Sequence, residues 1–379
     1  MKYPVKVLVL DTVMERGGIE TMIMNYLRNM DRSKVKYDFL VNRPYRADFE
    51  DEIEALGGRI FRMSPMYPQY FRRYKYEFQT FLLEHPEYRI IHSNLEERSY
   101  FPMRIAAGLG VPVRISHAHS VYNKFDAKKA FRDYFRSRLG DYPTHKFACS
   151  RMAAVWLYGE KSYNSGEVTI LPNAIETDKY RYDLEKRERM RAELGLSGNF
   201  VIGNTGRFVY QKNHRFLLDV FKEVHKARPE ARLLLLGDGP LREEILQRSV
   251  ELGLENYVIF IGTVNNVADY LQAMDIFLFP SFDEGLGIAV IEAQAAGLYS
   301  IMSDRVPREC DLTGNIGVLP LSAPPAFWAE KVLEKADFRD GMGYKSVRDA
   351  GYDIKERASW LQEYYIRALK TYFGSPSIA

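Results

Sequence analysis

The sequence predicts an α/β protein built from two parallel-sheet domains, and three observations lead to this prediction. Short apolar runs rich in β-formers alternate with amphipathic helical stretches from end to end, which is the pattern of βαβ units. The alternation starts again after a highly charged stretch, residues 183–194. The chain has 379 residues, more than one hydrophobic core usually supports.

The first series begins with a strand at 5–10, followed by Gly17 and Gly18 and then by a helix with apolar residues at three- and four-residue spacing. Further strands are expected at 37–41, 59–63, 89–92, 111–117, 146–148 and 168–171, and the clearest helices at 47–56 and 74–83. A glycine pair between strand and helix lets backbone approach a ligand, although an ordinary tight turn explains it equally well. GxGxxG is absent, which disfavours a nicotinamide oxidoreductase.

Two histidines, His117 and His119, come at the carboxyl end of the strand 111–117. Open parallel sheets bind ligands at that edge. A metal would need more ligands than this pair supplies nearby, and a satisfied core histidine is the commoner explanation for either residue. The sequence therefore marks this strand end as a candidate site without deciding between the two histidines.

The second series has expected strands at 200–205, 231–236, 258–261, 276–279 and 299–303, with helices at 215–226, 241–252, 267–274 and 327–335. The charged stretch 183–194 indicates a solvated face and a connection between the domains. A last helix is expected at 353–373, and its aromatic stripe is more typical of core packing than of a cofactor site.

The stretch 279–297, FPSFDEGLGIAVIEAQAAG, organises the second domain. A strand end leads into a glycine-bearing turn and then a helix, whose first N–H groups lack intrahelical partners and favour an anion. Glu284 precedes the helix and Glu292 lies within it, an arrangement suited to two different pairs of sugar hydroxyls. Two solvated glutamates on an ordinary strand-turn-helix unit are the alternative. A second loop, 206–213, carries Arg207 and Lys212 beside a helix start, which suits a diphosphate.

Six short motifs in one order connect these features: GGIE (17–20), HAH (117–119), LPNAI (171–175), GRxxxxKN (206–213), GDGP (237–240) and EGLGxxxxE (284–292). Together they resemble the family 4 retaining glycosyltransferases, particularly those of bacterial capsular and exopolysaccharide synthesis. The resemblance implies a GT-B fold, two Rossmann-like domains facing across a cleft. The expected domains are 1–180 on the acceptor side, 181–350 for the nucleotide-sugar donor, and a helix, 351–379, returning to the first domain.

The resemblance also implies roles for individual residues. Arg207 and Lys212 match the diphosphate-binding pair, Glu284 the residue set against the donor sugar, and Glu292 the acceptor of hydrogen bonds from the ribose diol. Further donor contacts are expected from the loop closing over the diphosphate (Gly17 and Gly18), from backbone around the sugar and phosphate (Gly285, Leu286, Gly287 and Ile288), and from residues framing the base (Gly262 and Val264). His119 or His117 would lie near the transferred sugar. One departure is Gly297-Leu298-Tyr299-Ser300, where the family usually has a proline.

The expected reaction separates positive charge at the anomeric carbon from negative charge on the leaving phosphate, which pre-oriented cations and amides stabilise. Retaining glycosidases use a carboxylate nucleophile, but the resemblance favours attack and departure on one face, with Glu284 positioning the sugar. No DxD-type pair follows a strand, and residues 48–51 are more typical of a solvated helix. We therefore expect metal independence and no cofactor beyond a nucleotide-sugar co-substrate, expected to be a UDP-sugar.

Composition limits the partners. Lys and Arg number 53 and Asp and Glu 50, a net charge of +3, which gives no global reason to expect nucleic acid. Cys149 and Cys310 form no CxxC pair, no run approaches a membrane span, and a cytoplasmic protein is expected. Basic, aromatic segments at 67–76 and 124–138 suggest contact with an anionic membrane carrying a lipid-linked saccharide acceptor; core packing or stacking on sugars are alternatives.

Three functions other than sugar transfer fit the sequence less well. A nucleotide-sugar epimerase of the same fold is compatible with the Gly-Arg-Lys-Asn segment, although the order of EGLGxxxxE favours transfer. A non-catalytic carbohydrate-binding scaffold would be expected to have lost Arg207, Lys212, Glu284 or Glu292, and all four are present. A glycogen-phosphorylase-like enzyme would need a cofactor lysine context that the sequence lacks.

Overall fold

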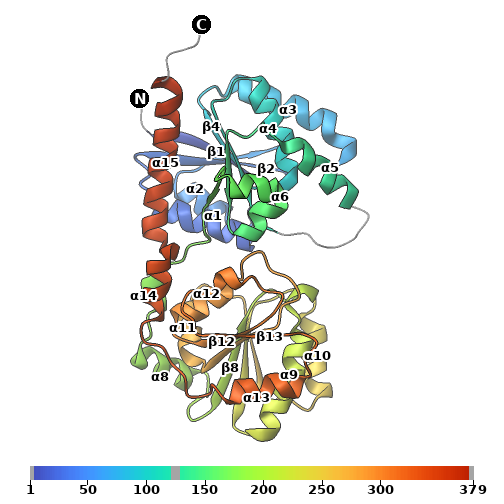
Figure 1. The fold of residues 1–379 in the computed structure, drawn as a ribbon, viewed down its shortest axis with the longest axis vertical. Coiled ribbons are helices and arrows are strands. Elements are labelled where there is room, and N and C mark those ends of the chain that lie inside the picture. The colour runs from blue at the N-terminus through green and yellow to red at the C-terminus, as the bar shows by residue number, and fades with distance from the viewer. Residues whose placement is uncertain (1–3, 121–128, 375–379) are drawn as a thin grey trace. The chain divides into compact units, whose positions relative to one another are not determined.

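The computed structural model describes residues 4–120 and 129–374, which form two compact units (Figure 1). Unit 1 contains the chain up to residue 174 together with the residues from 354 onwards, and unit 2 contains residues 175–353. The division lies before Thr177 because this residue belongs to the packing of unit 2: its hydroxyl donates to Asp353 Oδ2 at 2.6 Å. The sequence-based boundaries after 180 and 350 stand a few residues away.

Unit 1 contains a parallel sheet with the strand order β3-β2-β1-β4-β5-β6-β7. Its strands are β1 (Val5–Asp11), β2 (Val35–Val41), β3 (Ile60–Arg62), β4 (Ile90–Ser93), β5 (Val113–Ala118), β6 (His145–Ala148) and β7 (Val168–Ile170). Each expected strand of the first series is present. The order reverses between β1 and β4, and such a switch point is where open α/β sheets bind ligands.

Helices cover both faces of this sheet (Figure 1). They are α1 (Gly18–Asn29), α2 (Glu50–Ala55), α3 (Phe71–Glu84), α4 (Tyr100–Gly108), α5 (Lys129–Leu139), α6 (Arg151–Asn164) and α15 (Ile354–Gly374). The α15 helix packs with α1 in one core, where Leu361 and Tyr365 are fully buried. The expectation that its aromatic stripe serves core packing is therefore confirmed.

Unit 2 contains a second parallel sheet with the order β10-β9-β8-β11-β12-β13. Its strands are β8 (Phe200–Thr205), β9 (Ala231–Leu236), β10 (Val258–Gly262), β11 (Ile276–Phe279), β12 (Tyr299–Ser303) and β13 (Ile316–Leu319). The sequence did not predict β13, a four-residue edge strand with no fully buried residue. Here the strand order reverses between β8 and β11.

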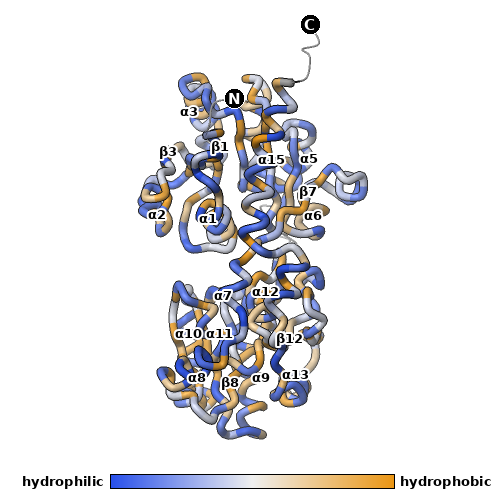
Figure 2. The backbone as a smooth tube through the Cα atoms, turned by 90° about the vertical axis from the view of Figure 1, so that its left-hand side faces the viewer, coloured by the Kyte–Doolittle hydropathy of each residue, from blue (hydrophilic) through white to orange (hydrophobic). Residues whose placement is uncertain are grey.

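The helices of unit 2 are α7 (Thr177–Tyr180), α8 (Leu184–Glu193), α9 (His214–Ala227), α10 (Arg242–Glu251), α11 (Val267–Ala273), α12 (Ile288–Ala295), α13 (Pro325–Leu333) and α14 (Gly343–Val347). The charged α8 is hydrophilic along most of its length (Figure 2) and presents the expected solvated face, since only Met190 and Arg191 are buried. It lies within unit 2, however, and does not connect the two units. It packs against α11, and Arg187 and Arg191 both pair with Asp275. Within the described ranges, no helix combines the length and apolarity needed to cross a bilayer.

Candidate functional site

The switch point of unit 2 is formed by two loops that are fastened to each other. We call residues 206–213 the β8 loop and residues 280–287 the β11 loop. Asn213 Nδ2 donates to the carbonyl of Pro280 at 3.1 Å, and the Phe282 amide donates to the carbonyl of Gln211 at 2.8 Å. The rings of Tyr210 and Phe282 stack with centroids 4.9 Å apart. The loops that carry the predicted cations and the predicted carboxylate therefore form one structure.

Lys212 and Glu284 meet at the centre of this structure. Lys212 Nζ lies 2.7 Å from Glu284 Oε1 and 4.9 Å from the ring centroid of Phe279. Glu284 is only 8% exposed, so its carboxylate depends on the ammonium for charge compensation. Arg207 is exposed on the same loop, and no ion pair or side-chain hydrogen bond fixes its guanidinium within residues 4–120 and 129–374. One cation is thus already paired and the other remains available to a ligand.

Glycines hold the β8 loop against the loop after β9. The Gly206 amide donates to the carbonyl of Leu236 at 2.9 Å, and an added Cβ at Gly237 would lie 2.1 Å from the Gly206 oxygen. Gly262 accepts from the Gly237 amide at 2.8 Å, while Val264 packs on the core of unit 2. The carboxyl ends of β8, β9 and β10 therefore stand side by side, and Gly262 and Val264 lie at the β10 end of this row.

The β11 loop ends at Gly287, which begins α12 in the left-handed conformation with φ 87°. A Cβ at this position would approach Val306 Cγ1 to 3.0 Å, so both backbone conformation and space favour glycine. Leu286 is buried in the core, which fixes the turn from inside. Because amides in the first turn of a helix have no intrahelical acceptor, those of Ile288 and Ala289 are available to an anion.

Glu292 lies one turn further along α12. Its Oε1 accepts a hydrogen bond from the hydroxyl of Tyr180 at 2.8 Å, and burial raises the pKa of its carboxyl to about 7. Tyr180 comes from α7 and was not among the predicted site residues. Its only sequence signal is its place shortly after the LPNAI motif.

In unit 1, the loop after β1 leads to Gly17, the residue that precedes α1. Its conformation is extended, with φ −119°, and the Thr21 amide donates to its carbonyl at 2.9 Å. An added Cβ at Gly17 would meet only the flexible carboxylate end of Glu20, and at Gly18 it would meet nothing within 4 Å. Contacts within the unit therefore do not require this glycine pair, and the space beside Gly18 is open.

The two candidate histidines of unit 1 differ in their surroundings. His117 is completely buried, and its Nδ1 lies 3.1 Å from His92 Nε2. His92 Nδ1 in turn lies 2.7 Å from the hydroxyl of Tyr365. His119 retains 6% exposure, and its Nε2 lies 2.9 Å from Asn94 Oδ1. Burial lowers the pKa of His119 to about 3, so the ring is neutral near pH 7. His117 therefore belongs to a buried chain of side chains that also contains His92 and Tyr365, whereas His119 lies just after the end of β5.

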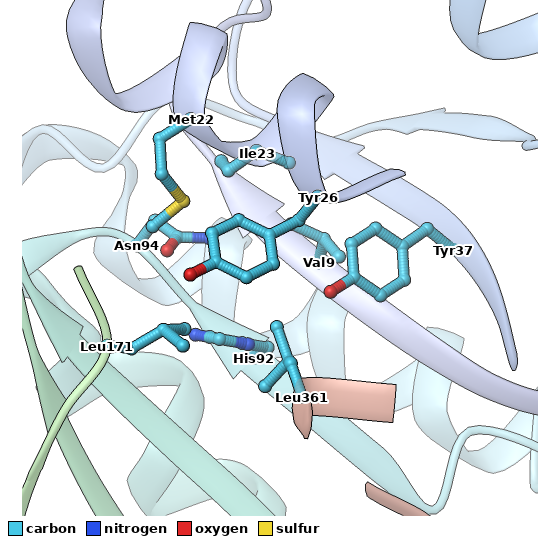
Figure 3. Close-up of a pocket in the computed structure, with 9 residues that line it drawn as sticks. All are labelled: Val9, Met22, Ile23, Tyr26, Tyr37, His92, Asn94, Leu171 and Leu361. Carbon is cyan, nitrogen blue, oxygen red and sulfur yellow. The ribbon is translucent and has the colours of Figure 1, made fainter. Parts of the chain in front are cut away.

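A small cavity lies beside this chain (Figure 3). The centre of a water-sized sphere can occupy a volume of about 10 Å³ inside it. The cavity therefore has room for about one water molecule. The residues around it are Val9, Met22, Ile23, Tyr26, Tyr37, His92, Asn94, Leu171 and Leu361. It is too small for a sugar. In the part of the chain that the structure describes, no group of three or more His, Cys, Asp or Glu residues is arranged to hold a metal ion.

Sequence comparisons assign both halves of the chain. Residues 16–179 match the family described as Glycosyltransferase Family 4, and residues 199–335 match Glycosyl transferases group 1. EpsF of Bacillus subtilis, a protein assigned to the glycosyltransferases, is 31% identical over 360 residues, which cover 93% of this chain and 94% of EpsF. The chain belongs to this glycosyltransferase family.

Two further relatives of the glycosyltransferase carry more specific names. The capsular polysaccharide biosynthesis glycosyltransferase CapH of Staphylococcus aureus is 26% identical over 374 residues, covering 96% of this chain and 99% of CapH. UDP-Gal:alpha-D-GlcNAc-diphosphoundecaprenol alpha-1,3-galactosyltransferase of Escherichia coli is 25% identical over 241 residues, covering 60% of this chain and 61% of that enzyme.

Solved structures agree on the fold of the glycosyltransferase. HepE of Anabaena, solved in complex with UDP, superposes with a TM-score of 0.77 at 17% identity, covering 96% of this chain and 100% of HepE. HepE has also been solved with UDP-glucose. At this identity the similarity concerns the fold alone, and it confirms the expected GT-B class with its two parallel-sheet α/β domains.

Proposed function

We propose that this glycosyltransferase moves a sugar, with retention of configuration, from a UDP-sugar to a saccharide or lipid-linked saccharide in capsular or exopolysaccharide synthesis. The observation that carries the proposal is the Lys212–Glu284 pair at the unit 2 switch point, with Arg207 exposed beside it. A diphosphate needs cations and free amides, and a sugar needs a hydrogen-bond acceptor; these groups occur together here. The names of CapH and the Escherichia coli galactosyltransferase support the acceptor class.

In this proposal Arg207, Lys212 and the first amides of α12 bind the diphosphate, and Glu284 holds the donor sugar. Glu292 accepts hydrogen bonds from the ribose, Gly262 and Val264 border the base, and His119 borders the transferred sugar. The leaving phosphate takes the proton of the attacking hydroxyl, so that the new glycosidic bond forms as the bond to the phosphate breaks. No metal ion or further cofactor takes part.

The test compares nucleotide-sugar turnover by the wild-type chain and by Glu284→Gln. UDP-glucose, UDP-galactose, GDP-mannose and ADP-glucose are supplied, and release of the nucleoside diphosphate is measured. We expect turnover of uridine donors, with a loss on the order of 10²-fold in Glu284→Gln and little change in UDP affinity. The exposed carboxylate of Glu243, replaced by Gln, is the control.

Three further results would contradict parts of the proposal. A glycosyl adduct on Glu284 in mass spectra would replace same-face attack by a covalent mechanism. Loss of turnover in a chelator would contradict metal independence. Interconversion of the sugar without its transfer would favour the epimerase alternative.

We also infer that the face formed by α3 contacts anionic lipid. Tyr70 and Tyr76 are exposed, and so are the neighbouring cations Arg72, Arg73 and Lys75. The second basic segment offers less, because Phe135 and Leu139 of α5 enter the core and residues 124–128 lie outside the described residues. Neutralising the three cations is expected to reduce co-sedimentation with phosphatidylserine vesicles; equal sedimentation of the variant and the wild type would contradict the inference.

A further inference from the structure

Glu96 has an unusual position at the switch point of unit 1. It begins the short 3-10 helix η2 (Glu96–Ser99) that follows β4, and it is only 4% exposed. Its φ is 54°, a left-handed conformation that the structure assigns to two non-glycine residues in its described ranges. The other is Asn213, a residue type that tolerates this conformation. A buried glutamate in a strained conformation suggests that the surrounding structure holds it there for a reason.

The hydrogen bonds of Glu96 leave one oxygen without a partner. Its Oε1 accepts from the backbone amide of His119 at 3.0 Å. Its Oε2 is buried and has no hydrogen-bond partner. Burial is the main cause that raises the pKa of this carboxyl to about 8, and the nearby Glu97 carboxylate acts in the same direction. The hydrogen bonds from the His119 amide and the Ser120 side chain and the charge of Arg98 oppose this shift. Near pH 7 the carboxyl is therefore largely protonated, and Oε2, opposite the accepting Oε1, can carry a hydrogen-bond donor.

His119 offers the complementary group. Its Nε2 faces Asn94 Oδ1, an oxygen that can only accept, so the proton of the neutral ring lies on Nε2. Its Nδ1 is then an acceptor, and this atom is also buried without a partner. Two adjacent side chains, each more than nine-tenths buried, thus present one unused donor and one unused acceptor. A hydroxyl group, which both donates and accepts, matches this pair.

We propose that Glu96 binds a hydroxyl of a saccharide together with His119. The inference rests on the proposed function and adds a sugar-binding residue that belongs to none of the six motifs. The hydroxyl accepts a hydrogen bond from the Glu96 carboxyl and donates one to His119 Nδ1. The saccharide is either the acceptor or the transferred sugar of the donor, since both present the same hydroxyl chemistry.

Binding by the full-length chain tests the proposal directly. Saturation-transfer NMR measures contact with methyl glycosides of glucose, galactose and N-acetylglucosamine, and calorimetry measures affinities for UDP and UDP-glucose. Glu96→Gly removes the carboxyl and suits the left-handed backbone, so its melting temperature is expected to stay within a few degrees of the wild type. Glu97→Gln is the control. Glu97 is also buried, and its Oε2 has no hydrogen-bond partner, but the positive charges of Arg98, Arg132 and Arg136 act on its carboxyl and oppose the rise of its pKa.

The expected result is at least a tenfold loss in Glu96→Gly and none in Glu97→Gln. A loss confined to methyl glycosides identifies the acceptor, and a loss confined to UDP-glucose, with UDP unchanged, identifies the transferred sugar. Three outcomes would overturn the inference. The first is binding of methyl glycosides and of UDP-glucose by Glu96→Gly that equals binding by the wild type, and the second is an equal loss in the control. The third is a wild-type chain that binds no glycoside and prefers UDP-glucose no more than UDP. Glycoside binding that depends on Glu96 in a chain that transfers no sugar would support the inference and contradict the proposed function.

Discussion

The two sheets reverse their strand order in equivalent ways, yet the side chains gathered at the two switch points differ in charge. In unit 2, Lys212 and Glu284 form an ion pair at 2.7 Å and Arg207 lies exposed beside them. In unit 1, burial lowers the pKa of His119 to about 3 and raises that of Glu96 to about 8. Both of these groups are therefore mainly uncharged near pH 7.

The difference follows from the hydration that each ligand loses on binding, because the protein must replace it with its own contacts. A diphosphate that leaves water loses strong hydration, and only cations and oriented amides compensate for this loss. A sugar hydroxyl loses two or three ordinary hydrogen bonds, which neutral buried groups can supply without the cost of desolvating a charge. The same sheet topology can thus present fixed charges in one unit and neutral donors and acceptors in the other.

The prediction with the largest expected effect concerns the charged groups at the switch point of unit 2. Lys212→Ala removes one cation and leaves Glu284 buried without its counter-charge, so turnover of a UDP-sugar is expected to fall by roughly 10²–10³-fold. The loss in UDP affinity should shrink as salt is added, because the removed contact is electrostatic. The matched control is Lys226→Ala, on the exposed surface of α9. Turnover within a factor of two of the wild type would contradict the role of Lys212.

The sequence was sufficient where local patterns determine structure. The strands β8, β9, β11 and β12 were predicted with the bounds that the structure gives, because each carries apolar β-formers between stretches of polar or turn residues. Lys212 and Glu284 are 72 residues apart, but each follows a strand that borders the switch point. Motif order and parallel-sheet topology together were therefore enough to predict that they serve one site.

The sequence was insufficient where function depends on burial and long-range partners. Glu96 belongs to the polar run Asn94-Leu95-Glu96-Glu97-Arg98, which is typical of a solvated loop, and nothing local indicates a left-handed, buried carboxyl. Tyr365 was correctly expected in the core, but its hydroxyl contacts His92, 273 residues away. No spacing rule connects such residues, and only the packed sheet brings them together.

A second prediction tests the uncharged side chains that are buried in unit 1. In unit 1 the hydroxyls of Tyr37 and Tyr365 lie 2.9 Å apart, and the latter contacts His92 at 2.7 Å. Tyr365→Phe leaves both partners buried with an unused polar group, so the free energy of unfolding of unit 1 is expected to fall by about 1–3 kcal/mol. Unlike the effect of Lys212, this loss should not depend on salt. Denaturant unfolding followed by tryptophan fluorescence measures it, and the control is Tyr372→Phe on the exposed end of α15. A loss of equal size in the control would contradict the buried chain as its cause.

The smallest expected effect concerns Glu292, where unit 2 departs from its own charged pattern. Burial raises the pKa of this carboxyl from 4.5 to about 7 in the folded chain, so the folded state holds the proton more tightly than the unfolded state. The stability from this group is fully present below pH 4.5 and is lost as the pH rises to about 7. In Glu292→Gln this loss disappears, and the variant should gain roughly 1–2 kcal/mol relative to the wild type between pH 5 and pH 6.5. Unfolding curves at the two pH values give the difference. Glu243→Gln should show none, because that side chain is exposed. If the relative stability of Glu292→Gln stays constant with pH, Glu292 is ionised in the folded chain at both pH values, and the uncharged pattern belongs to unit 1 alone.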